Sequence, residues 1–94
     1  MSKQHGERHY VGIDVSAREL VVAERTAAGP RRWVVSNSVA GHEHLAARLR
    51  EREGGTRVCL EASGNYSLDV ALRLSQEPGV EVSLVNPRQA RRFA

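Results

Sequence analysis

The sequence contains few residues of several types, and each shortage excludes a class of protein. Its one cysteine, Cys59, allows neither an internal disulfide nor a multi-cysteine zinc site. Aromatic residues make up only 4%, so a core has to be built mainly from Val, Leu and Ala. No apolar run approaches the roughly 20 residues that span a membrane, and residues 1–9 lack the apolar segment of a signal peptide. We therefore expect a cytoplasmic protein that makes no membrane contact.

The chain does contain enough apolar sequence for one small domain, together with a slight excess of positive charge. Of its 94 residues 40% are hydrophobic, and the formal net charge is +3. A chain of this length supports a single core. A mildly basic balance is compatible with a polyanionic partner such as nucleic acid, but it does not identify one.

Alternating apolar residues predict three strands in the first part of the chain, over residues 9–16, 19–26 and 31–36. The links between these strands are short, which predicts an antiparallel meander. Residues 1–8 are polar and are expected to form a disordered leader. The first strand carries an acid, Asp14, in an otherwise apolar run, and such local contradictions are expected at functional sites.

A helix and a fourth strand are expected next. Apolar residues at helical spacing predict the helix over about 41–53, with His42 and His44 facing solvent. Two glycines end this helix. The fourth strand is expected over 56–61, where Cys59 is interpreted as a small buried hydrophobic residue.

A second helix, a fifth strand and a short basic helix complete the expected elements. The second helix is predicted to begin at Ser63 or Gly64, and the fifth strand to cover 80–85. A basic helix is expected from Pro87 onward, with Asn86 as its N-cap. The stripe expected on the second helix consists of Leu68, Ala71, Leu72 and Ser75.

The resulting order is β-β-β-α-β-α-β. Right-handed crossovers through the two helices place the fourth and fifth strands parallel to the first. The first strand then lies in the centre, between the second and the fourth. This is the mixed five-stranded sheet of the ribonuclease-H-like α/β fold. Because neighbouring parallel strands end at the same edge, Asp14 and Glu61 are expected side by side, on strands about 4.8 Å apart.

Two carboxylates at this spacing repel each other unless a proton or a cation lies between them. Hard oxygen ligands suit Mg²⁺ or Mn²⁺, and open α/β sheets bind ligands at the carboxyl ends of their strands. We therefore interpret Asp14 and Glu61 as metal-binding catalytic residues for phosphodiester chemistry. Taken singly, Asp14 also suits a cap of the turn at Ser16, and Glu61 an acid at a helix N-terminus.

Two further groups are candidates for contacts with nucleic acid. Ser63 and Gly64 open the second helix, where free backbone N–H groups bind phosphate; an ordinary N-cap and turn explain them equally well. Arg88, Arg91 and Arg92 cluster without a nearby acid and suit the phosphate backbone. A solvated helix face is the alternative for these arginines.

Three stretches of the chain resemble one known family when they are taken together. They are Tyr-Val-Gly-Ile-Asp-Val-Ser at 10–16, Cys-Leu-Glu-Ala-Ser-Gly-Asn-Tyr at 59–66 and Val-Asn-Pro-Arg-Gln-Ala-Arg at 85–91. In this order and spacing they closely resemble the transposases of the IS-one-ten group of insertion sequences. These are DEDD transposases, whose RuvC-like N-terminal domain works with a bridge RNA.

The resemblance implies a RuvC-like domain over 9–94 in which four acids bind Mg²⁺ or Mn²⁺. Asp14 matches the first acid and Glu61 the second. The family's last two acids follow the Asn-Pro-Arg segment, and they are expected beyond Ala94, as is a further domain with a serine nucleophile. The resemblance also implies DNA as substrate, a structured guide RNA as partner and a homo-oligomer of the full-length protein. We therefore expect a catalytic-domain fragment of a DNA transposase, inactive as an isolated 94-residue piece.

Two other functions fit part of the pattern. An actin-like or sugar-kinase ATPase also begins with a strand, an acid and a hairpin, but it usually places glycines directly after the acid. Here Val15 and Ser16 follow Asp14, which disfavours phosphate binding at that turn. A nucleic-acid-binding or dimerisation module without activity of its own is the other alternative.

Overall fold

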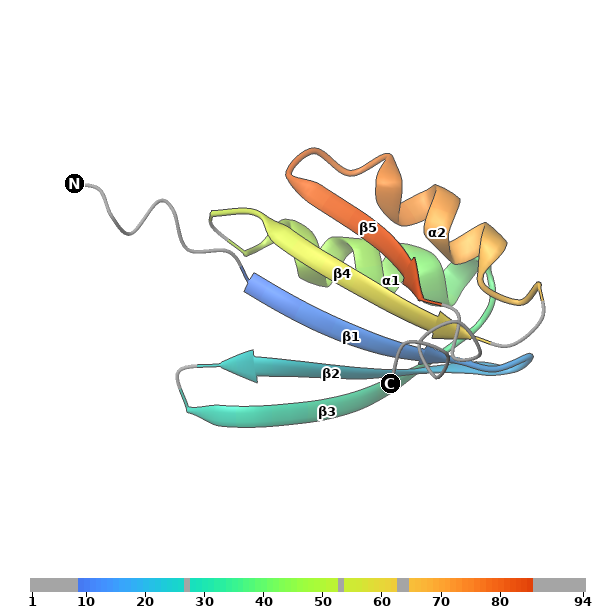
Figure 1. The fold of residues 1–94 in the computed structure, drawn as a ribbon, viewed down its shortest axis with the longest axis horizontal. Coiled ribbons are helices and arrows are strands. Elements are labelled where there is room, and N and C mark those ends of the chain that lie inside the picture. Colours follow the sequence, from blue (N-terminus) through green and yellow to red (C-terminus); the bar gives the residue numbers. More distant parts are fainter. Residues whose placement is uncertain (1–8, 27, 53, 63–64, 86–94) are drawn as a thin grey trace.

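The computed structural model describes residues 9–26, 28–52, 54–62 and 65–85, which form one five-stranded sheet and two helices (Figure 1). The elements are β1 (His9–Val15), β2 (Glu19–Thr26), β3 (Gly29–Ser36), α1 (Val39–Arg50), β4 (Thr56–Ala62), α2 (Leu68–Ser75) and β5 (Val80–Val85). The predicted order β-β-β-α-β-α-β is confirmed. Within the part of the chain so described, no helix is long and apolar enough to cross a membrane.

The sheet has the strand order β3-β2-β1-β4-β5, with β1 in the centre. The β1–β2 and β2–β3 pairs are antiparallel, whereas β4 runs parallel to both β1 and β5. Both parallel connections pass through a helix, as crossover connections of parallel strands require. The predicted ribonuclease-H-like arrangement is therefore present.

Both helices begin at different residues from those predicted. α1 starts at Val39 because Ser38 is its N-cap, and the Ser38 side chain accepts a hydrogen bond from the Gly41 N–H at 3.2 Å. α2 starts at Leu68, later than the predicted Ser63 or Gly64, and Ser67 is its N-cap residue. The predicted starting residues, Ser63 and Gly64, lie outside the described part of the chain.

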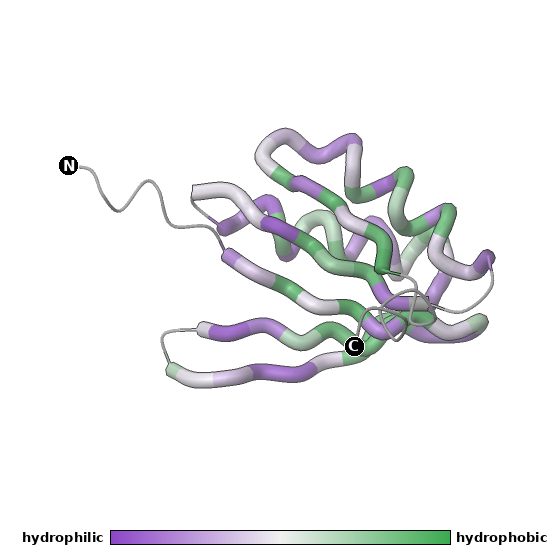
Figure 2. Tube along the Cα trace, viewed as in Figure 1, coloured by the Kyte–Doolittle hydropathy of each residue, from purple (hydrophilic) through white to green (hydrophobic). Residues whose placement is uncertain are grey.

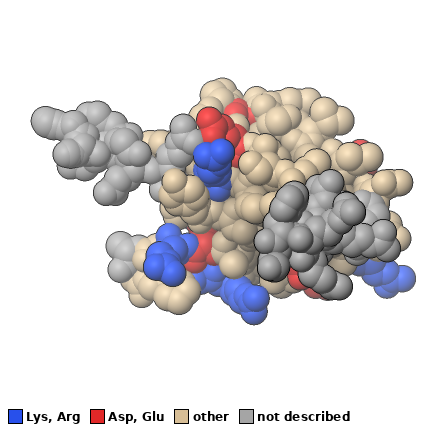
Figure 3. Space-filling model, in the orientation of Figure 1, with Lys and Arg blue, Asp and Glu red and all other residues tan. Residues whose placement is uncertain are grey.

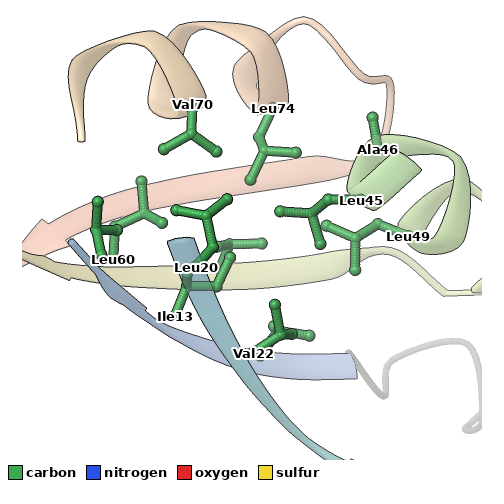
Figure 4. Close-up of a cluster of buried hydrophobic side chains, with 12 residues drawn as sticks. Ile13, Leu20, Val22, Leu45, Ala46, Leu49, Leu60, Val70 and Leu74 are labelled. Atoms are coloured by element: carbon green, nitrogen blue, oxygen red, sulfur yellow. The ribbon is translucent and has the colours of Figure 1, made fainter. Parts of the chain in front are cut away.

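The hydrophobic core lies between one face of the sheet and the two helices (Figure 4). Every second residue of the central strands points into it, while the outer strand β3 is largely hydrophilic (Figure 2). The core contains Val11, Ile13, Val15, Leu20, Val22, Leu45, Ala46, Leu49, Val58, Leu60, Val70 and Leu74. None of the described elements covers the opposite face, which we call the open face. Its residues include Tyr10, Gly12, Asp14, Val21, Ala23, Arg32, Val34, Cys59 and Glu61.

Of the stripe expected on α2, only Ala71 packs against the core. Val70 and Leu74 are fully buried, whereas Leu68 and Leu72 are 54% and 63% exposed. Both pairs are apolar and four residues apart, so both give a helical stripe. The two stripes lie about 200° apart around the helix. Packing against the sheet buries the stripe of Val70 and Leu74, which the sequence analysis did not choose.

A buried ionic cluster ties the covered face of the sheet to the end of α1. The Glu24 side chain is fully buried and accepts hydrogen bonds from Arg52 at 2.6 Å, Trp33 Nε1 at 2.8 Å and His9 Nε2 at 2.9 Å. Burial by itself raises the pKa of Glu24, but the hydrogen bonds from His9, Arg52 and Trp33 outweigh it and lower the pKa to about 2. The cluster therefore holds this carboxylate ionised inside the core.

A second cluster joins α1 to the end of α2. Glu77 is 7% exposed and accepts hydrogen bonds from Arg50 at 2.8 and 3.0 Å, and it lies 2.9 Å from Arg73. The bond from Arg50 is the main cause that lowers the pKa of Glu77 to about 2. Arg73 also donates to Glu43 of α1 at 2.6 and 2.9 Å. These contacts fix the two helices relative to each other.

Replacing the buried acid of the first cluster should destabilise the fold. Glu24→Gln removes the charge that three donors surround and leaves Arg52 without its charged partner, which costs about 3 kcal/mol of unfolding free energy. Urea unfolding measures this loss. Glu19→Gln, an exposed acid on the same strand, is the matched control and should change the unfolding free energy by less than about 0.5 kcal/mol. Equal effects of the two substitutions would contradict the role of the cluster.

The stability contributed by Glu24 should depend on pH in a defined window. Its folded pKa is about 2 and its ordinary pKa 4.5, so the contribution is complete above the ordinary value and is lost as pH falls through the folded value. The difference in unfolding free energy between wild type and Glu24→Gln should shrink between about pH 5 and about pH 2. Urea titrations across this range test it, and a constant difference would show that folding does not shift the pKa of Glu24.

Candidate functional site

Asp14 and Glu61 lie opposite each other at the carboxyl ends of the parallel strands β1 and β4. Their neighbours Ile13 and Leu60 point into the core, 2% and 0% exposed, so both acids project from the open face and are exposed. Neither carboxylate has a hydrogen bond or ion pair within the described residues. The predicted juxtaposition of the two acids is confirmed. The apparent contradiction of an acid in a buried strand disappears, because this face of the strand is not buried.

A hollow of about 240 Å³ contains both acids, and we call it the open-face hollow. Its lining comes from all five strands, namely from Gly12, Ile13, Asp14, Val21, Ala23, Arg32, Cys59, Glu61 and Val85. Gly12 lies at its centre between Ala23 and Cys59, and a Cβ added there would meet nothing within 4 Å. The middle of the floor is therefore open and built from small side chains.

Arg32 is a site residue that the sequence analysis did not select. β3 pairs with β2 so that Arg32 lies opposite Ala23, and Ala23 lies opposite Gly12 of β1. Arg32 is exposed, has no ion pair within the described residues and lines the open-face hollow with Asp14 and Glu61. In Figure 3 some basic side chains lie at the lower left, over the β2–β3 side of the sheet, and others lie in the upper part of the view and at its right edge. The alternation of β3 was the available signal, since it separates Arg32 from its inward-facing neighbour Trp33.

Cys59 was predicted to be buried and is exposed instead. It lies opposite Gly12 on the open face and lines the open-face hollow. The prediction assumed that β4 is covered on both faces. In the described structure the helices cover one face only. Cys59 lies two residues before Glu61 on β4 and therefore points to the same, uncovered face.

Some predicted contacts fall outside the described residues. Ser63 and Gly64 lie there, as do Arg88, Arg91 and Arg92. Within the described residues, no group of three or more His, Cys, Asp or Glu side chains is arranged to hold a metal ion. The site that the structure describes thus consists of two carboxylates with an arginine nearby.

The two carboxylates fit a magnesium-type ion. Mg²⁺ is commonly bound by one or two carboxylates and completes its shell with water and phosphate oxygens. Asp14 and Glu61 are exposed, adjacent and without partners in the described structure, which leaves their oxygens available. Cys59 lines the same hollow, but no group of three or more such ligands is found among the described residues, as a closed zinc site would need.

His42 is buried, contrary to the prediction that it faces solvent. It is 6% exposed, and its Nε2 lies 2.7 Å from Asn37 Oδ1. Burial lowers the pKa of His42, although Asp69 and Glu43 oppose this effect. His42 lines a second hollow, of about 560 Å³, on the side of the sheet that carries the helices; we call it the helix-side hollow. His44 is exposed, as predicted.

The fold resembles that of a solved structure of another protein. The T. thermophilus RuvC structure in complex with a Holliday junction substrate superposes with a TM-score of 0.56 and 19% sequence identity. The match covers 92% of this chain and 69% of the RuvC chain. This likeness shows a RuvC-like, ribonuclease-H-like α/β fold, in agreement with the predicted fold class.

Other comparisons add little. Two structures of the Aquifex aeolicus PPX-GPPA enzyme match with TM-scores of 0.43 and 0.42 at 12% and 13% identity, and this chain spans 37% and 38% of them. No protein-family model matches the sequence, and no curated protein matches it either.

Proposed function

We propose that this chain is the RuvC-like catalytic domain of a metal-dependent enzyme that cleaves and rejoins DNA. The observation that carries the proposal is the register of β1 and β4, which places Asp14 beside Glu61 at the carboxyl edge of a RuvC-like sheet. Ligand sites of open α/β sheets lie at this edge. The two acids are exposed in an open hollow, which suits an extended polymer better than a small enclosed ligand.

Asp14 and Glu61 would hold Mg²⁺ or Mn²⁺, and Arg32 would contact the nucleic-acid backbone. A bound divalent ion supplies Lewis-acid activation of a phosphoryl oxygen and of the attacking nucleophile. The two acids bind and orient this ion through their oxygens. Arg32, on the far side of the same hollow, offers a planar fork of donors for a phosphate and sets the direction in which the strand crosses the sheet.

The finer proposal is a DNA transposase of the IS-one-ten group. Its support is the resemblance of three motifs, which contain Asp14, Glu61 and Arg88. In this proposal residues 9–94 belong to the RuvC-like domain, and the third and fourth acids of the metal site come from chain beyond Ala94. A structured guide RNA and a homo-oligomer of the full-length protein belong to the same proposal.

Branched DNA is the first substrate to test, because the RuvC structure was determined with a Holliday junction. An ATPase is the less favoured function. The turn after Asp14 is closed by Ser16, whose backbone N–H donates to the Glu19 carbonyl at 3.0 Å. That N–H is therefore not available to bind a nucleotide phosphate.

Removing either acid should weaken metal binding. Asp14→Asn and Glu61→Gln should each lower Mn²⁺ affinity at least about tenfold, because each removes a charged ligand, and tenfold corresponds to about 1.4 kcal/mol. Calorimetry with Mn²⁺ measures the change. Asp69→Asn is the matched control, since Asp69 is an exposed acid in the helix-side hollow, and it should leave the affinity unchanged. Equal losses in all three variants would contradict a site at Asp14 and Glu61.

Arg32 should contribute to binding of branched DNA through the phosphate backbone. Arg32→Ala should weaken binding and reduce by about one the slope of log affinity against log salt concentration, because one phosphate contact is lost. Fluorescence anisotropy at several salt concentrations measures both. Arg31→Ala is the control, because Arg31 is also exposed but lies on the side of β3 that faces away from the open-face hollow. If Arg31→Ala lowers the slope equally, the arginines act only through net charge.

A further inference from the structure

The side chain of Asn37 bonds to two residues that are distant in sequence, Ser16 and Tyr66, and to the nearby His42. Asn37 lies between β3 and α1, and its Nδ2 donates to the Ser16 carbonyl at 2.8 Å and to the Tyr66 carbonyl at 3.1 Å. Its Oδ1 accepts from His42 Nε2 at 2.7 Å. Its backbone N–H donates to the Arg18 carbonyl at 2.8 Å. These bonds span up to 29 residues of sequence, so they are tertiary contacts.

The two carbonyls belong to the loops that follow the strands of the candidate metal site. Ser16 comes two residues after Asp14, and Tyr66 comes five residues after Glu61. The hydrogen-bonded ladder between β1 and β4 ends at Val15, one residue beyond Asp14. The ends of ladders are where strands open most easily. The Asn37 side chain therefore bridges Ser16 and Tyr66, which come one and four residues after the last paired residues of β1 and β4.

The orientation of the Asn37 amide follows from its partners. Backbone carbonyls only accept hydrogen bonds, so the NH₂ group must face Ser16 and Tyr66, and the oxygen must face His42. His42 Nε2 consequently carries the hydrogen. Because His42 is 6% exposed and begins the buried face of α1, its position is fixed by packing. The bridge is thus anchored to the helix layer on one side and to both loops on the other.

We propose that Asn37 is a positioning residue, which holds the ends of β1 and β4 so that the Asp14 and Glu61 carboxylates bind one metal ion together. This inference rests on the proposed function. Asn37 reaches the loops from the helix-side hollow, whereas the carboxylates project from the open face. It acts through the backbone of the two loops and does not touch the ion.

The substitution that separates positioning from general stability is Asn37→Asp. The two side chains have the same shape, and the carboxylate still accepts from His42. It has no N–H, however, so the Ser16 and Tyr66 carbonyls lose their donor. Asn65→Asp is the matched control. It adds the same charge beside the same hollow, and the Asn65 side chain has no hydrogen bond within the described residues.

Mn²⁺ calorimetry on the 94-residue chain gives the first readout. We expect Asn37→Asp to weaken binding about tenfold, which is about 1.4 kcal/mol, and Asn65→Asp to leave it unchanged. An added negative charge alone strengthens cation binding, so weakening cannot come from the charge. His42→Phe keeps a ring in the buried position but removes the donor to Asn37, and we expect a smaller loss of about threefold from it. Wild-type affinity in Asn37→Asp, or equal weakening in Asn65→Asp, would overturn the inference.

Hydrogen exchange gives a second readout that does not need metal. In Asn37→Asp the amides of residues 16–19 and 65–68 should exchange faster, while those of Leu45 and Leu49 in the core of α1 keep their protection. Unchanged exchange in the two loops would overturn the bridge itself. If wild type binds no Mn²⁺ yet the loops still exchange faster in the variant, the proposed metal function fails while the bridge stands, so the two failures are distinguishable.

Discussion

The parallel pairing of β1 with β4 is the constraint on which both the fold and the candidate site depend. It places Asp14 opposite Glu61 and, on the other face, packs Val58 and Leu60 into the core. A slip of one residue would turn Leu60 toward solvent and bury Glu61, because side chains alternate between the faces of a strand. Burial of two apolar residues of β4 therefore fixes the spacing of the two acids. The chain needs no separate contact between the acids to bring them together.

The same sheet contains glutamates in two opposite situations, and the difference separates structure from function. Glu24 on the covered face is surrounded by three donors, which keep it ionised in the core. Glu61 on the open face has no partner among the described residues. A buried carboxylate without donors is too costly to persist, so Glu24 has its donors supplied by the fold. An exposed carboxylate carries no such requirement, and its oxygens stay available to a ligand.

The strand order and the Asp14–Glu61 pair could be predicted because alternation and the crossover rule act along the backbone and need no knowledge of packing. The predictions that were wrong concern which side of a helix or strand is covered. α2 carries two equivalent apolar stripes, and only contact with the sheet selects Val70 and Leu74 over Leu68 and Leu72. Cys59 was assigned to the core because the sequence does not say that one face stays uncovered. His42 and Arg32 were missed because each lines a hollow with residues that are distant in sequence.

The placement of Asn37 indicates that the geometry of the open face is set partly from the opposite side of the sheet. A ladder of backbone hydrogen bonds fixes Cα positions but stops at Val15, and strand ends beyond it depend on other contacts. Placing the holding group among the exposed acids would put its amide in competition with a cation for their oxygens. Asn37 avoids this competition because it bonds to the backbone of the loops from the helix layer. The open face thereby stays clear for the metal ion and the nucleic-acid strand that we propose to bind there, while Asn37 supports the site from the other side of the sheet.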